Sequence, residues 1–495
     1  MLELFGAGFS VIFANPLNIL LIFTGVLAGI IFGALPGLTT VAALSMFLPI
    51  TYGMHLGIAL AVLTGIYIGG TSGGLVSAIL LNIPGTPSSI ATCFDGRPLA
   101  LKGQAGKALG VGIFCSFLGT MGSIAAMVFI SPLLAAFTIK FGPWENFAVT
   151  VFALALISSL VGKSLTKGLL SAFFGMMIAT IGMAPIDSAN RYTFGSLDLT
   201  SGLTLLPVLV GLYAISEVVS NAGGGHGQRA SIISDFKIKG LGFSFLEFKG
   251  QITNIIRSML IGIGIGILPG IGGSTSNLIA YSVAKNSSKK PEDFGTGIID
   301  GVVASETSNN ATIGGAMIPL LTLGIPGDGS TALLLGGFML HGVTPGPLLF
   351  ETNGAAVYTI FAAMIVSSFL MMIIMYAGMK GFVQILKIPS FILLPVIVVL
   401  CIIGAYVVNF RTFDAWGLLI FGIIGILMQK FGVPIPPLIL GFILGEPFET
   451  NLRRGLQYSN GNFLDIVNHP IALAFFGLLI LFFTLTGIQK RKRKK

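Results

Sequence analysis

The chain has 495 residues, of which 54% are hydrophobic and only 9% are charged, and its mean hydropathy is +0.95. Soluble domains are about 25% charged, so this composition excludes a soluble globular protein and predicts an all-α polytopic membrane protein. The formal net charge is +9, but the run from Lys490 to Lys495 supplies six of these charges and leaves +3. The charge balance therefore gives no reason to expect nucleic-acid binding.

The N-terminal residues Met1 to Leu4 lack the basic segment that opens a cleavable signal peptide, and the apolar run after them continues into a full span. We therefore expect this segment to be retained. A transmembrane helix needs about 20 apolar residues. That criterion gives these candidate segments: 17–35, 57–81, 108–136, 145–161, 168–186, 203–221, 255–284, 310–325, 330–348, 355–378, 388–409, 415–429, 433–446 and 470–488. Several are short or interrupted, so we expect 11 or 12 full spans, about 12 transmembrane helices, together with re-entrant hairpins.

The longest polar interval lies near the middle of the chain and is basic, with Arg229, Lys237, Lys239 and Lys249. Basic loops and tails next to spanning segments face the cytoplasm, so we place this linker and the C-terminus there. The predicted division of the chain is a first membrane repeat (1–220), a cytoplasmic linker (221–252), a second membrane repeat (253–488) and a basic cytoplasmic tail (489–495). The end of the linker is apolar and contains Phe243, Phe245, Leu246 and Phe248. We expect it to form either an amphipathic segment in the membrane interface or a plain loop.

The two halves contain related motifs in the same order, 233 to 242 positions apart. The matched pairs are Gly33–Gly37 with Gly266–Gly270, Gly70–Gly74 with Glu306–Asn310, and Ile83–Ser89 with Ile325–Thr331. Three ordered pairs predict two internal structural repeats. Many secondary transporters are duplicated in this way, and the interrupted segments of both halves meet at a site near the middle of the membrane.

The segment between Arg257 and Lys285 has basic residues on both sides, so both of its ends should face the cytoplasm. Pro269 and Gly270 fall near its middle. Two legs of about 12 residues reach only about 18 Å each, which is too short for two crossings of a ~30 Å hydrocarbon core. We therefore expect a re-entrant hairpin with these two residues near its tip; one long helix is the alternative. The direction of the corresponding first-half segment stays open.

Four runs of Pro, Gly, Ser and Thr begin new helical segments, whose first N–H groups have no partner within the helix. With the helix dipole, such groups form an anion site, and glycine lets a ligand approach the backbone. The predicted substrate-binding residues are Pro36, Gly37, Thr39, Thr40, Pro84, Gly85, Thr86, Ser88, Ser89, Pro269, Gly270, Gly272, Gly273, Ser274, Thr275, Pro326, Gly327, Gly329, Ser330 and Thr331. The alternative is that these breakers only allow close helix packing.

Two carboxylates, Glu306 and Asp328, lie inside the second-half motifs together with Asn309 and Asn310. An acid within a membrane segment is a functional candidate by default, so these four residues are our candidates for coupling to Na+ or a proton. The alternative is that either acid caps a helix or lies in a wet loop.

Other functional classes find little support in the sequence. No Walker A run and no nucleophile elbow are present, and the four histidines are scattered without metal-ligand spacing. We expect no enzyme, no cofactor apart from a possible coupling Na+, and no structural metal. An anion channel and a membrane-embedded enzyme remain as alternatives; the first needs no coupling and the second needs a catalytic constellation. The stretch Asp95-Gly-Arg97, followed by Lys102 and Lys107, is expected to form a cytoplasmic loop.

At these motifs the sequence resembles the large membrane subunit of the tripartite tricarboxylate transporters, the TctA family. The resemblance rests on the Gly-Ala-Leu-Pro-Gly run at 33–37, the Ile-Pro-Gly-Thr-Pro-Ser-Ser run at 83–89, the Leu-Pro-Gly run at 268–270 and the Ile-Pro-Gly-Asp-Gly run at 325–329. It extends over essentially the whole chain.

The resemblance implies a multi-pass secondary transporter of the bacterial inner membrane that imports di- or tricarboxylates such as citrate by symport. It also implies two partners, a small four-span membrane subunit and a periplasmic substrate-binding protein, and a driving gradient of Na+ or H+. An elevator-like movement of the motif-bearing domain is plausible for this class. A channel for organic anions, or a transporter for another small carboxylate, is the alternative.

Overall fold

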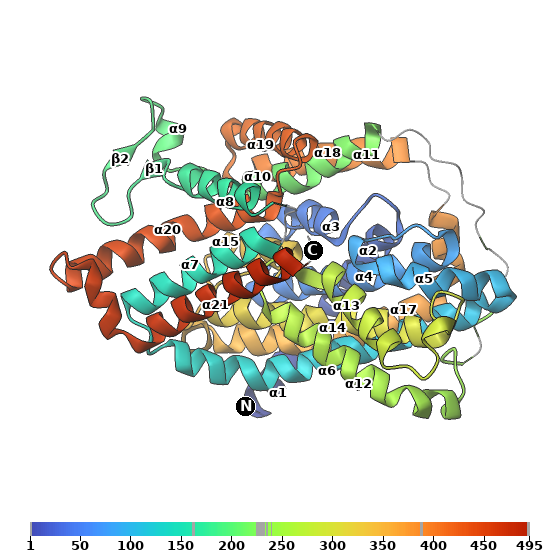
Figure 1. Cartoon of the computed structure of the whole chain (residues 1–495). Coiled ribbons are helices and arrows are strands. Elements are labelled where there is room, and N and C mark those ends of the chain that lie inside the picture. Colours follow the sequence, from blue (N-terminus) through green and yellow to red (C-terminus); the bar gives the residue numbers. More distant parts are fainter. Residues whose placement is uncertain are drawn as a thin grey trace. The chain divides into compact units, whose positions relative to one another are not determined.

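The described part of the chain is almost entirely helical, which confirms the expected all-α fold class (Figure 1). The computed structural model describes residues 2–160, 164–223, 233, 236–238, 240–386 and 390–492. Much of the expected linker and the end of the expected basic tail lie outside these residues. The chain forms two compact units: unit 1, Met1–Ala135 and Leu209–Ile426, and unit 2, Ala136–Val208 and Leu427–Lys495.

Unit 1 contains every motif that the sequence singled out. Its elements, with η for 3-10 or π helices, are α1 (Leu2–Phe13), α2 (Pro16–Ala34), α3 (Thr40–Phe47), η1 (Pro49–Gly53), α4 (Leu56–Leu81), η2 (Pro87–Ser89), α5 (Ile90–Leu99), η3 (Ala100–Gln104), α6 (Ala105–Thr138), α10 (Leu205–Val210), η4 (Gly211–Ile215), α11 (Ser216–Gly223), α12 (Phe245–Ile267), α13 (Gly272–Asn286), η5 (Pro291–Asp293), α14 (Ile299–Leu323), α15 (Gly329–Leu340), α16 (Leu349–Thr352), α17 (Gly354–Ile385), α18 (Ser390–Asn409) and α19 (Thr412–Lys430). Helices α6, α10 and α19 run across the unit boundaries. Because unit 1 combines both sets of motifs, the compact units do not follow the predicted repeat boundaries, which stay a prediction.

Unit 2 is a group of helices with one short hairpin. Its elements are α7 (Pro143–Leu160), α8 (Leu165–Ala179), β1 (Gly182–Met183), β2 (Asn190–Arg191), α9 (Leu197–Thr200), α20 (Ile435–Tyr458), η6 (Phe463–Asn468) and α21 (Pro470–Lys492). Trp144 and Phe147 of α7 pack with Ile466 and Ala472 to form its core.

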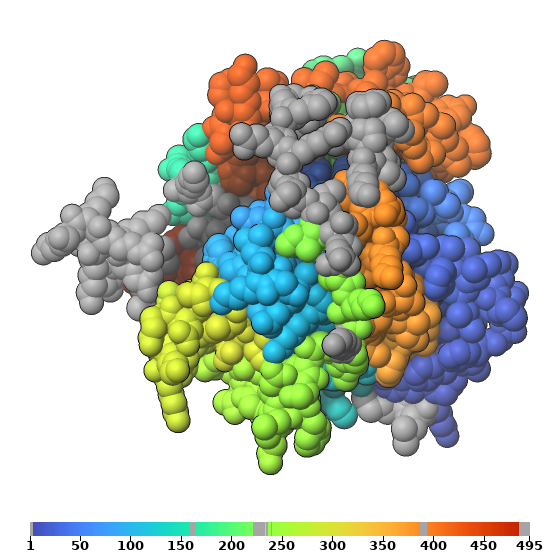
Figure 2. Space-filling view, turned by 90° about the vertical axis from the view of Figure 1, so that its right-hand side faces the viewer, coloured from blue at the N-terminus to red at the C-terminus, as the bar shows by residue number. Residues whose placement is uncertain are grey.

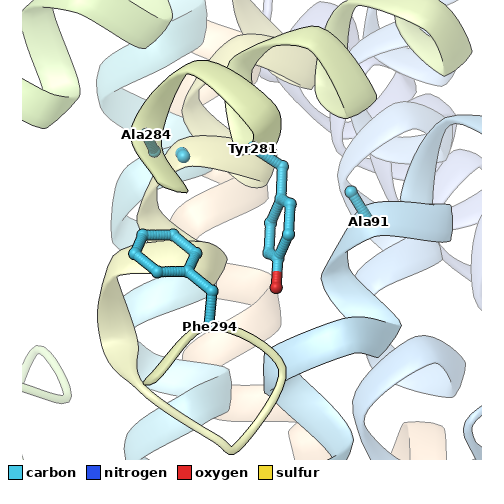
Figure 3. Packing of buried hydrophobic residues seen from close by; sticks show 5 residues of the cluster. Ala91, Tyr281, Ala284 and Phe294 are labelled. Carbon is cyan, nitrogen blue, oxygen red and sulfur yellow. The ribbon is translucent and has the colours of Figure 1, made fainter. Parts of the chain in front are cut away.

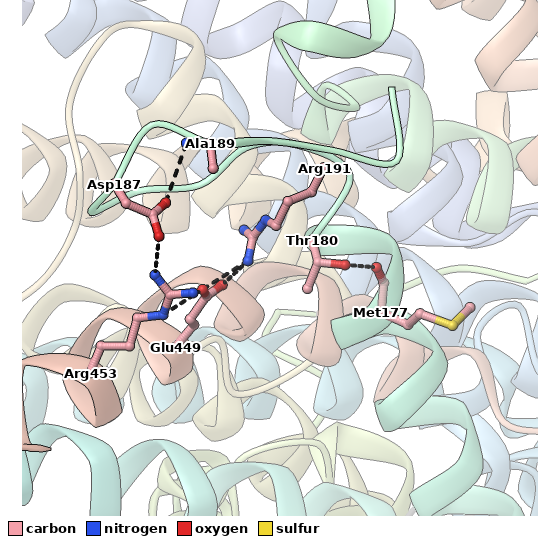
Figure 4. Close-up of polar contacts among 7 residues, drawn as sticks. All are labelled: Met177, Thr180, Asp187, Ala189, Arg191, Glu449 and Arg453. Carbon is pink, nitrogen blue, oxygen red and sulfur yellow. Dashed lines mark hydrogen bonds and ion pairs between the residues drawn. The ribbon is translucent and has the colours of Figure 1, made fainter. Parts of the chain in front are cut away.

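The hairpin of unit 2 is held to α20 by ion pairs (Figure 4). Arg191 donates to both carboxylate oxygens of Glu449, at 2.8 and 2.9 Å. Arg453, one turn further along α20, donates to Asp187 in the hairpin loop at 2.9 Å. These pairs fix the loop although its strands have only two residues each.

Six helical segments among the described residues are long and apolar enough to cross a membrane. They are Pro16–Ala34, Leu56–Leu81, Pro87–Thr138, Phe245–Ile267, Gly354–Ile385 and Thr412–Lys430. Shorter apolar helices of 10–17 residues accompany them. The chain is therefore a multi-pass membrane protein by the length and composition of its helices, and the expected total of 11 or 12 spans stays a prediction.

Several expected segments have different boundaries in the structure. The segment expected at 17–35 is confirmed as α2, which begins at Pro16 because the Asn15 side chain accepts a hydrogen bond from the Leu17 N–H; a separate helix, α1, precedes it. The segment expected at 310–325 begins at Ile299, since the polar stretch before it is buried within the protein rather than exposed.

Three residues of the aromatic end of the linker, Phe245, Leu246 and Phe248, lie in the first turn of α12, and Phe243 directly precedes its N-cap, so the plain-loop alternative is wrong. The Ser244 hydroxyl accepts from the Glu247 N–H at 3.3 Å, and the Glu247 carboxylate accepts from the Ser244 N–H at 2.8 Å. This reciprocal pair is a capping box, whose Ser-x-x-Glu signature is visible in the sequence. Phe243 and Phe248 pack edge-on against Phe114 of α6.

Equivalent contacts between helices confirm the internal repeat. In each repeat, glycines on one helix press against backbone carbonyl groups of the next, with no room for a side chain. These contacts are Gly29 with Ile66 and Gly33 with Gly70 in the first repeat, and Gly262 with Ser308 and Gly266 with Thr312 in the second. The glycines are 233 positions apart and their partners are 242 apart. The counterpart of Gly70 is therefore Thr312 and not Glu306, with which the sequence motifs had aligned it.

The two repeats run in opposite directions, which the sequence left open. Ser72, in the middle of α4, contacts Asn310 in the middle of α14. Tyr67, nearer the start of α4, contacts Asp328, which lies beyond the end of α14. The end of α4 lies near the start of α14, because Gly96 of α5 packs on Ile79 of α4 and its neighbour Asp95 contacts Gly301. Helices α4 and α14 are thus antiparallel, and the repeat is inverted. Inverted repeats are a common basis of secondary transporter folds.

Helices α12 and α13 form the expected hairpin with Pro269 and Gly270 at its turn, and its re-entrant path in the membrane stays a prediction. Its contacts along α14 are Asn254 with Asp300, Gly262 with Ser308 and Gly266 with Thr312 for α12, then Gly273 with Thr312, Ser276 with Ser308 and Tyr281 with Gly301 for α13. Both ends of the hairpin therefore lie beside the start of α14, and its tip at Pro269 and Gly270 lies beside the middle. The returning helix α13 has 15 residues, or about 22 Å, too short for a ~30 Å core.

Candidate functional site

The candidate site is centred where α4 and α14 cross, because both inverted repeats contribute polar groups there. Nearly all residues of both helices are buried, as expected for helices that carry apolar residues on every side. The Ser72 hydroxyl donates to Asn310 Oδ1 at 2.7 Å, and Asn309 Nδ2 donates to the Thr71 carbonyl at 3.3 Å. Side chains 238 positions apart in sequence thus join the two repeats through neutral hydrogen bonds.

Glu306 lies one turn before this crossing and is fully buried. Its carboxylate accepts hydrogen bonds from the Thr92 hydroxyl, from the Ser116 hydroxyl at 3.0 Å and from Asn310 Nδ2 at 3.4 Å. All of these partners are neutral. A buried acidic group is costly unless it is hydrogen-bonded, and these three donors supply that compensation for Glu306.

Asp328 is the N-cap of α15. Its Oδ1 accepts from the Thr331 N–H at 2.8 Å, and the Thr331 hydroxyl in turn accepts from the Asp328 N–H at 2.8 Å. Its Oδ2 accepts from the Tyr67 hydroxyl of the first repeat at 2.6 Å. The N-terminus of α15, predicted to hold a substrate anion, therefore already has a carboxylate of the protein in place, and a second anion there would be repelled.

Two more of the predicted helix N-termini are also capped by side chains. Thr39 accepts from the Ala42 N–H at the start of α3 and donates to Glu217 Oε2 at 2.8 Å. At η2, Thr86 and Ser89 form a capping box. These residues satisfy the free N–H groups locally.

The N-terminus of α13 is different, because no side chain in the described part of the chain caps it. Gly270 and Gly272 have φ angles of 80° and 63°, which only glycine adopts without strain. The Gly270 N–H donates to the Gly327 carbonyl at 2.7 Å, which joins two of the predicted runs. A Cβ added at Gly273 would lie 3.0 Å from Cβ of Ser88, so the first-repeat run at 84–89 meets this helix end.

The structure brings together most of the predicted residues, and on α13 it buries two residues that were not predicted. Ser274 and Thr275 are half-buried and exposed, whereas Ser276 and Asn277 are fully buried and point inward. Ser276 and Ser308 share a hydrogen bond of 2.5 Å. The run at 36–40 reaches the site through Thr40, which packs against Gly70, and through Val41, which lies beside Gly329.

Several site residues were not predicted from the sequence. They are Tyr67, Thr92, Ser116, Glu217 and Asn277. Tyr67 and Ser116 are polar residues inside long apolar helices, which is a usable signal, whereas the other three lie in helices of mixed composition. That signal does not say which of the many such residues face the same point.

Asp95 was expected in a cytoplasmic loop but lies within α5 and is fully buried. Its Oδ1 accepts from the N–H groups of Gly295, Gly297 and Ile298 at 2.8 to 3.1 Å, and its Oδ2 accepts from the Tyr281 hydroxyl at 2.9 Å. The loop before α14 supplies these donors, with Gly295 and Gly297 at φ angles of 91° and 99°, so the carboxylate is a structural clamp.

The clamp and the packing around it join segments that are distant in sequence. Tyr281 lies beside Ala91, Ala284 and Phe294, as Figure 3 shows. On the surface, the light-blue start of α6 lies between the yellow α13–α14 loop and the green start of α12 (Figure 2). These are the segments whose basic residues predicted a cytoplasmic face.

These features define the class of the protein: a polytopic membrane protein with an inverted repeat, whose broken helices meet at a buried polar centre, as in secondary transporters. A family model described as "Tripartite tricarboxylate transporter TctA family" matches residues 19–440. The chain belongs to this family, which confirms the resemblance seen in the sequence. Membership makes it the large subunit of a tricarboxylate transporter that works with other subunits.

Two relatives from Agrobacterium vitis are also similar. The chain is 36% identical over 483 residues to the "Uncharacterized 52.8 kDa protein in TAR-I ttuC' 3'region", covering 97% of this chain and 96% of the relative. It is 38% identical over 231 residues to the "Uncharacterized protein in TAR-II ttuC' 3'region", covering 47% of this chain and 96% of that protein. No solved structure matches the chain.

Proposed function

We propose that this chain is the transmembrane subunit of an importer for di- or tricarboxylates resembling citrate, which works by symport with Na+ or H+. Its partners are a small four-span membrane subunit and a periplasmic substrate-binding protein, and its location is the bacterial inner membrane with the C-terminus in the cytoplasm. The observation that carries the proposal is the uncapped N-terminus of α13, which lies where the two inverted repeats meet.

The substrate carboxylate binds to the first N–H groups of α13, at Gly272 and Gly273. A helix N-terminus favours an anion through its free N–H groups and its dipole. Ser88, in the first-repeat run at 84–89, lies against this turn, and its hydroxyl is available to the same substrate carboxylate. The other three predicted runs of Pro, Gly, Ser and Thr start helices that have side-chain caps. We propose that their residues position these broken helices around the N-terminus of α13.

Movement of unit 1 as the substrate-carrying body is the transport step that we propose. Support comes from the distribution of motifs, since unit 1 contains both sets and unit 2 contains neither. Glu306 is the candidate for proton coupling, because its partners are neutral and a change of protonation there needs no ion pair to break.

The test is uptake by proteoliposomes that contain this chain and the small membrane subunit, with the periplasmic binding protein added. Labelled citrate, other dicarboxylates and a monocarboxylate are offered under an imposed Na+ gradient, an imposed pH gradient or neither. Accumulation against a concentration gradient, with chemically unchanged substrate inside, is expected for a di- or tricarboxylate. Passive equilibration alone would mean an anion channel, and a converted product would mean an enzyme.

A binding measurement on the detergent-purified chain complements the uptake test. A ligand that binds only the folded state stabilises it by about 2.7 kcal/mol at a hundredfold excess over Kd. We expect a rise of Tm with a tricarboxylate or dicarboxylate but not with acetate. Replacement of Gly273 by Ala, which brings a methyl group within 2.6 Å of Asn309 Oδ1, should remove that rise.

A further inference from the structure

Two buried amide oxygens near the start of α13 have no hydrogen-bond partner among the described residues: Oδ1 of Asn277 and Oδ1 of Asn309. Both side chains are fully buried. Their nitrogens are engaged, since Asn277 Nδ2 donates to the Ser88 carbonyl and Asn309 Nδ2 donates to the Thr71 carbonyl. Turning either amide over would place its oxygen against a carbonyl oxygen, so the hydrogen-bond pattern fixes which atom is unpaired.

The two oxygens belong to one place in the fold. A Cβ added at Gly273 would lie 2.6 Å from Asn309 Oδ1, 3.0 Å from Cβ of Ser88 and 3.3 Å from Thr312 Oγ1. Asn277 follows Gly273 by one helical turn on the same face, and it binds Ser88 as well. The Thr312 hydroxyl donates to the Asn309 carbonyl at 2.6 Å, so its oxygen keeps acceptor capacity.

Buried acceptors without a donor are rare in folded proteins, and each one calls for a partner. The four runs of Pro, Gly, Ser and Thr contain no Lys or Arg that would supply a hydrogen-bond donor. Uncharged amide and hydroxyl oxygens suit a hard cation. Ca2+ and Mg2+ sites draw on carboxylates, so this neutral set favours a monovalent ion.

We propose that Asn277 Oδ1, Asn309 Oδ1 and Thr312 Oγ1 bind a monovalent metal cation, Na+ in the first instance, directly beside the substrate anion. This inference rests on the proposed function, because the positive end of the α13 dipole disfavours a cation there unless an anion is also bound. The cation and the carboxylate therefore bind together, each raising the affinity for the other by the same factor. That reciprocity is the coupling step of a symporter.

The test measures Tm and 22Na+ binding of the detergent-purified full chain with and without citrate. NaCl, KCl and choline chloride are compared at one ionic strength. We expect the stabilisation by citrate to be larger in Na+ than in choline. The stabilisation in K+ shows whether the site prefers Na+ over K+. Asn309→Leu and Asn277→Leu should each lower 22Na+ affinity by about tenfold or more, the scale seen when metal-site residues are lost.

The matched control is Asn254→Leu, which removes a buried asparagine of α12 whose amide is fully paired with Asp300, Gln251 and Arg257. It should lower stability but keep the Na+ effect. If the leucine variants do not fold, the smaller replacements Asn309→Ala and Asn277→Ala take their place, and each should lower 22Na+ affinity in the same way.

Several outcomes decide the matter. An Na+ effect unchanged in both leucine variants, or citrate stabilisation equal in Na+, K+ and choline, overturns the cation site while leaving carboxylate binding in place. Na+ binding that depends on both asparagines but responds to no carboxylate overturns the coupling between cation and anion and contradicts the proposed substrate.

Discussion

The hydroxyl of Tyr67, in the first repeat, donates a 2.6 Å hydrogen bond to Asp328, the residue that caps α15 in the second repeat. Tyr67 is almost fully buried, so no water replaces this bond when it is lost. We expect Tyr67→Phe to lower the free energy of unfolding by about 2 kcal/mol, the range for hydrogen bonds to charged groups. Denaturant unfolding of the purified chain measures this, with Tyr406→Phe, 40% exposed, as control. Equal stability of both variants would show that the bond does not hold the repeats together.

Gly327 allows the backbone of its run to touch the hairpin tip. A Cβ at this position would lie 2.7 Å from Gly266 O and 2.7 Å from Cα of Ala316. Gly327→Ala is therefore expected to lower stability by roughly 1 to 3 kcal/mol through overpacking. The control is Gly264→Ala on α12, where nothing lies within 4 Å and the helix gains slightly from alanine. Thermal unfolding compares the two, and a loss of stability at Gly264 alone would contradict the packing argument.

Glu306 should tolerate an amide but not an alkyl side chain. The Thr92 and Ser116 hydroxyls that face it can donate or accept, so Glu306→Gln should stay within about 1 kcal/mol of the natural chain. Glu306→Leu leaves the Ser116 hydroxyl without this acceptor and Thr92 with only Ser305, and should cost about 2 to 3 kcal/mol. Chemical unfolding distinguishes these variants. Equal destabilisation by Gln and Leu would indicate that the ionised carboxylate itself is required.

Asp95 should control the α13–α14 loop. Its carboxylate accepts three backbone N–H groups there, and each charge-assisted bond contributes about 1.5 to 3 kcal/mol. We expect Asp95→Ala to raise amide hydrogen exchange at Gly295, Gly297 and Ile298 by at least about tenfold. Asp95→Asn keeps an acceptor oxygen and should show a smaller rise. Unchanged exchange in the alanine variant would rule out a clamp.

The hairpin loop of unit 2 should loosen in acid. The hydrogen bond from Arg453 holds the pKa of Asp187 below its usual value. A carboxyl whose pKa is lower in the folded state stabilises that state above its unfolded pKa, near 4, and this contribution is lost as pH falls through the lower folded pKa. Hydrogen exchange of residues 184–191 should therefore increase below about pH 4. Asp187→Asn should exchange faster at neutral pH and lose this dependence; a pH effect of the same size in that variant would assign it to another group.

The sequence by itself determined the membrane class, the positions of the helix breaks and the existence of two related halves. These features follow from local chemistry: apolar length defines a span, and Pro or Gly interrupts a helix wherever it occurs. The hairpin at Pro269 and Gly270 was predictable because charge on both sides and a short length leave few alternatives. The capping box of Ser244 and Glu247 was equally readable.

Only the tertiary structure decided which polar groups meet. It showed that the repeats are inverted, that Asp328 caps its own helix and binds Tyr67, and that Asn277 rather than Thr275 points inward. A sequence motif states that a helix end is free, but not whether a residue more than 200 positions away already occupies it. That depends on how α4 and α14 pack, and packing is set by contacts along the whole length of both helices rather than by neighbours in the chain.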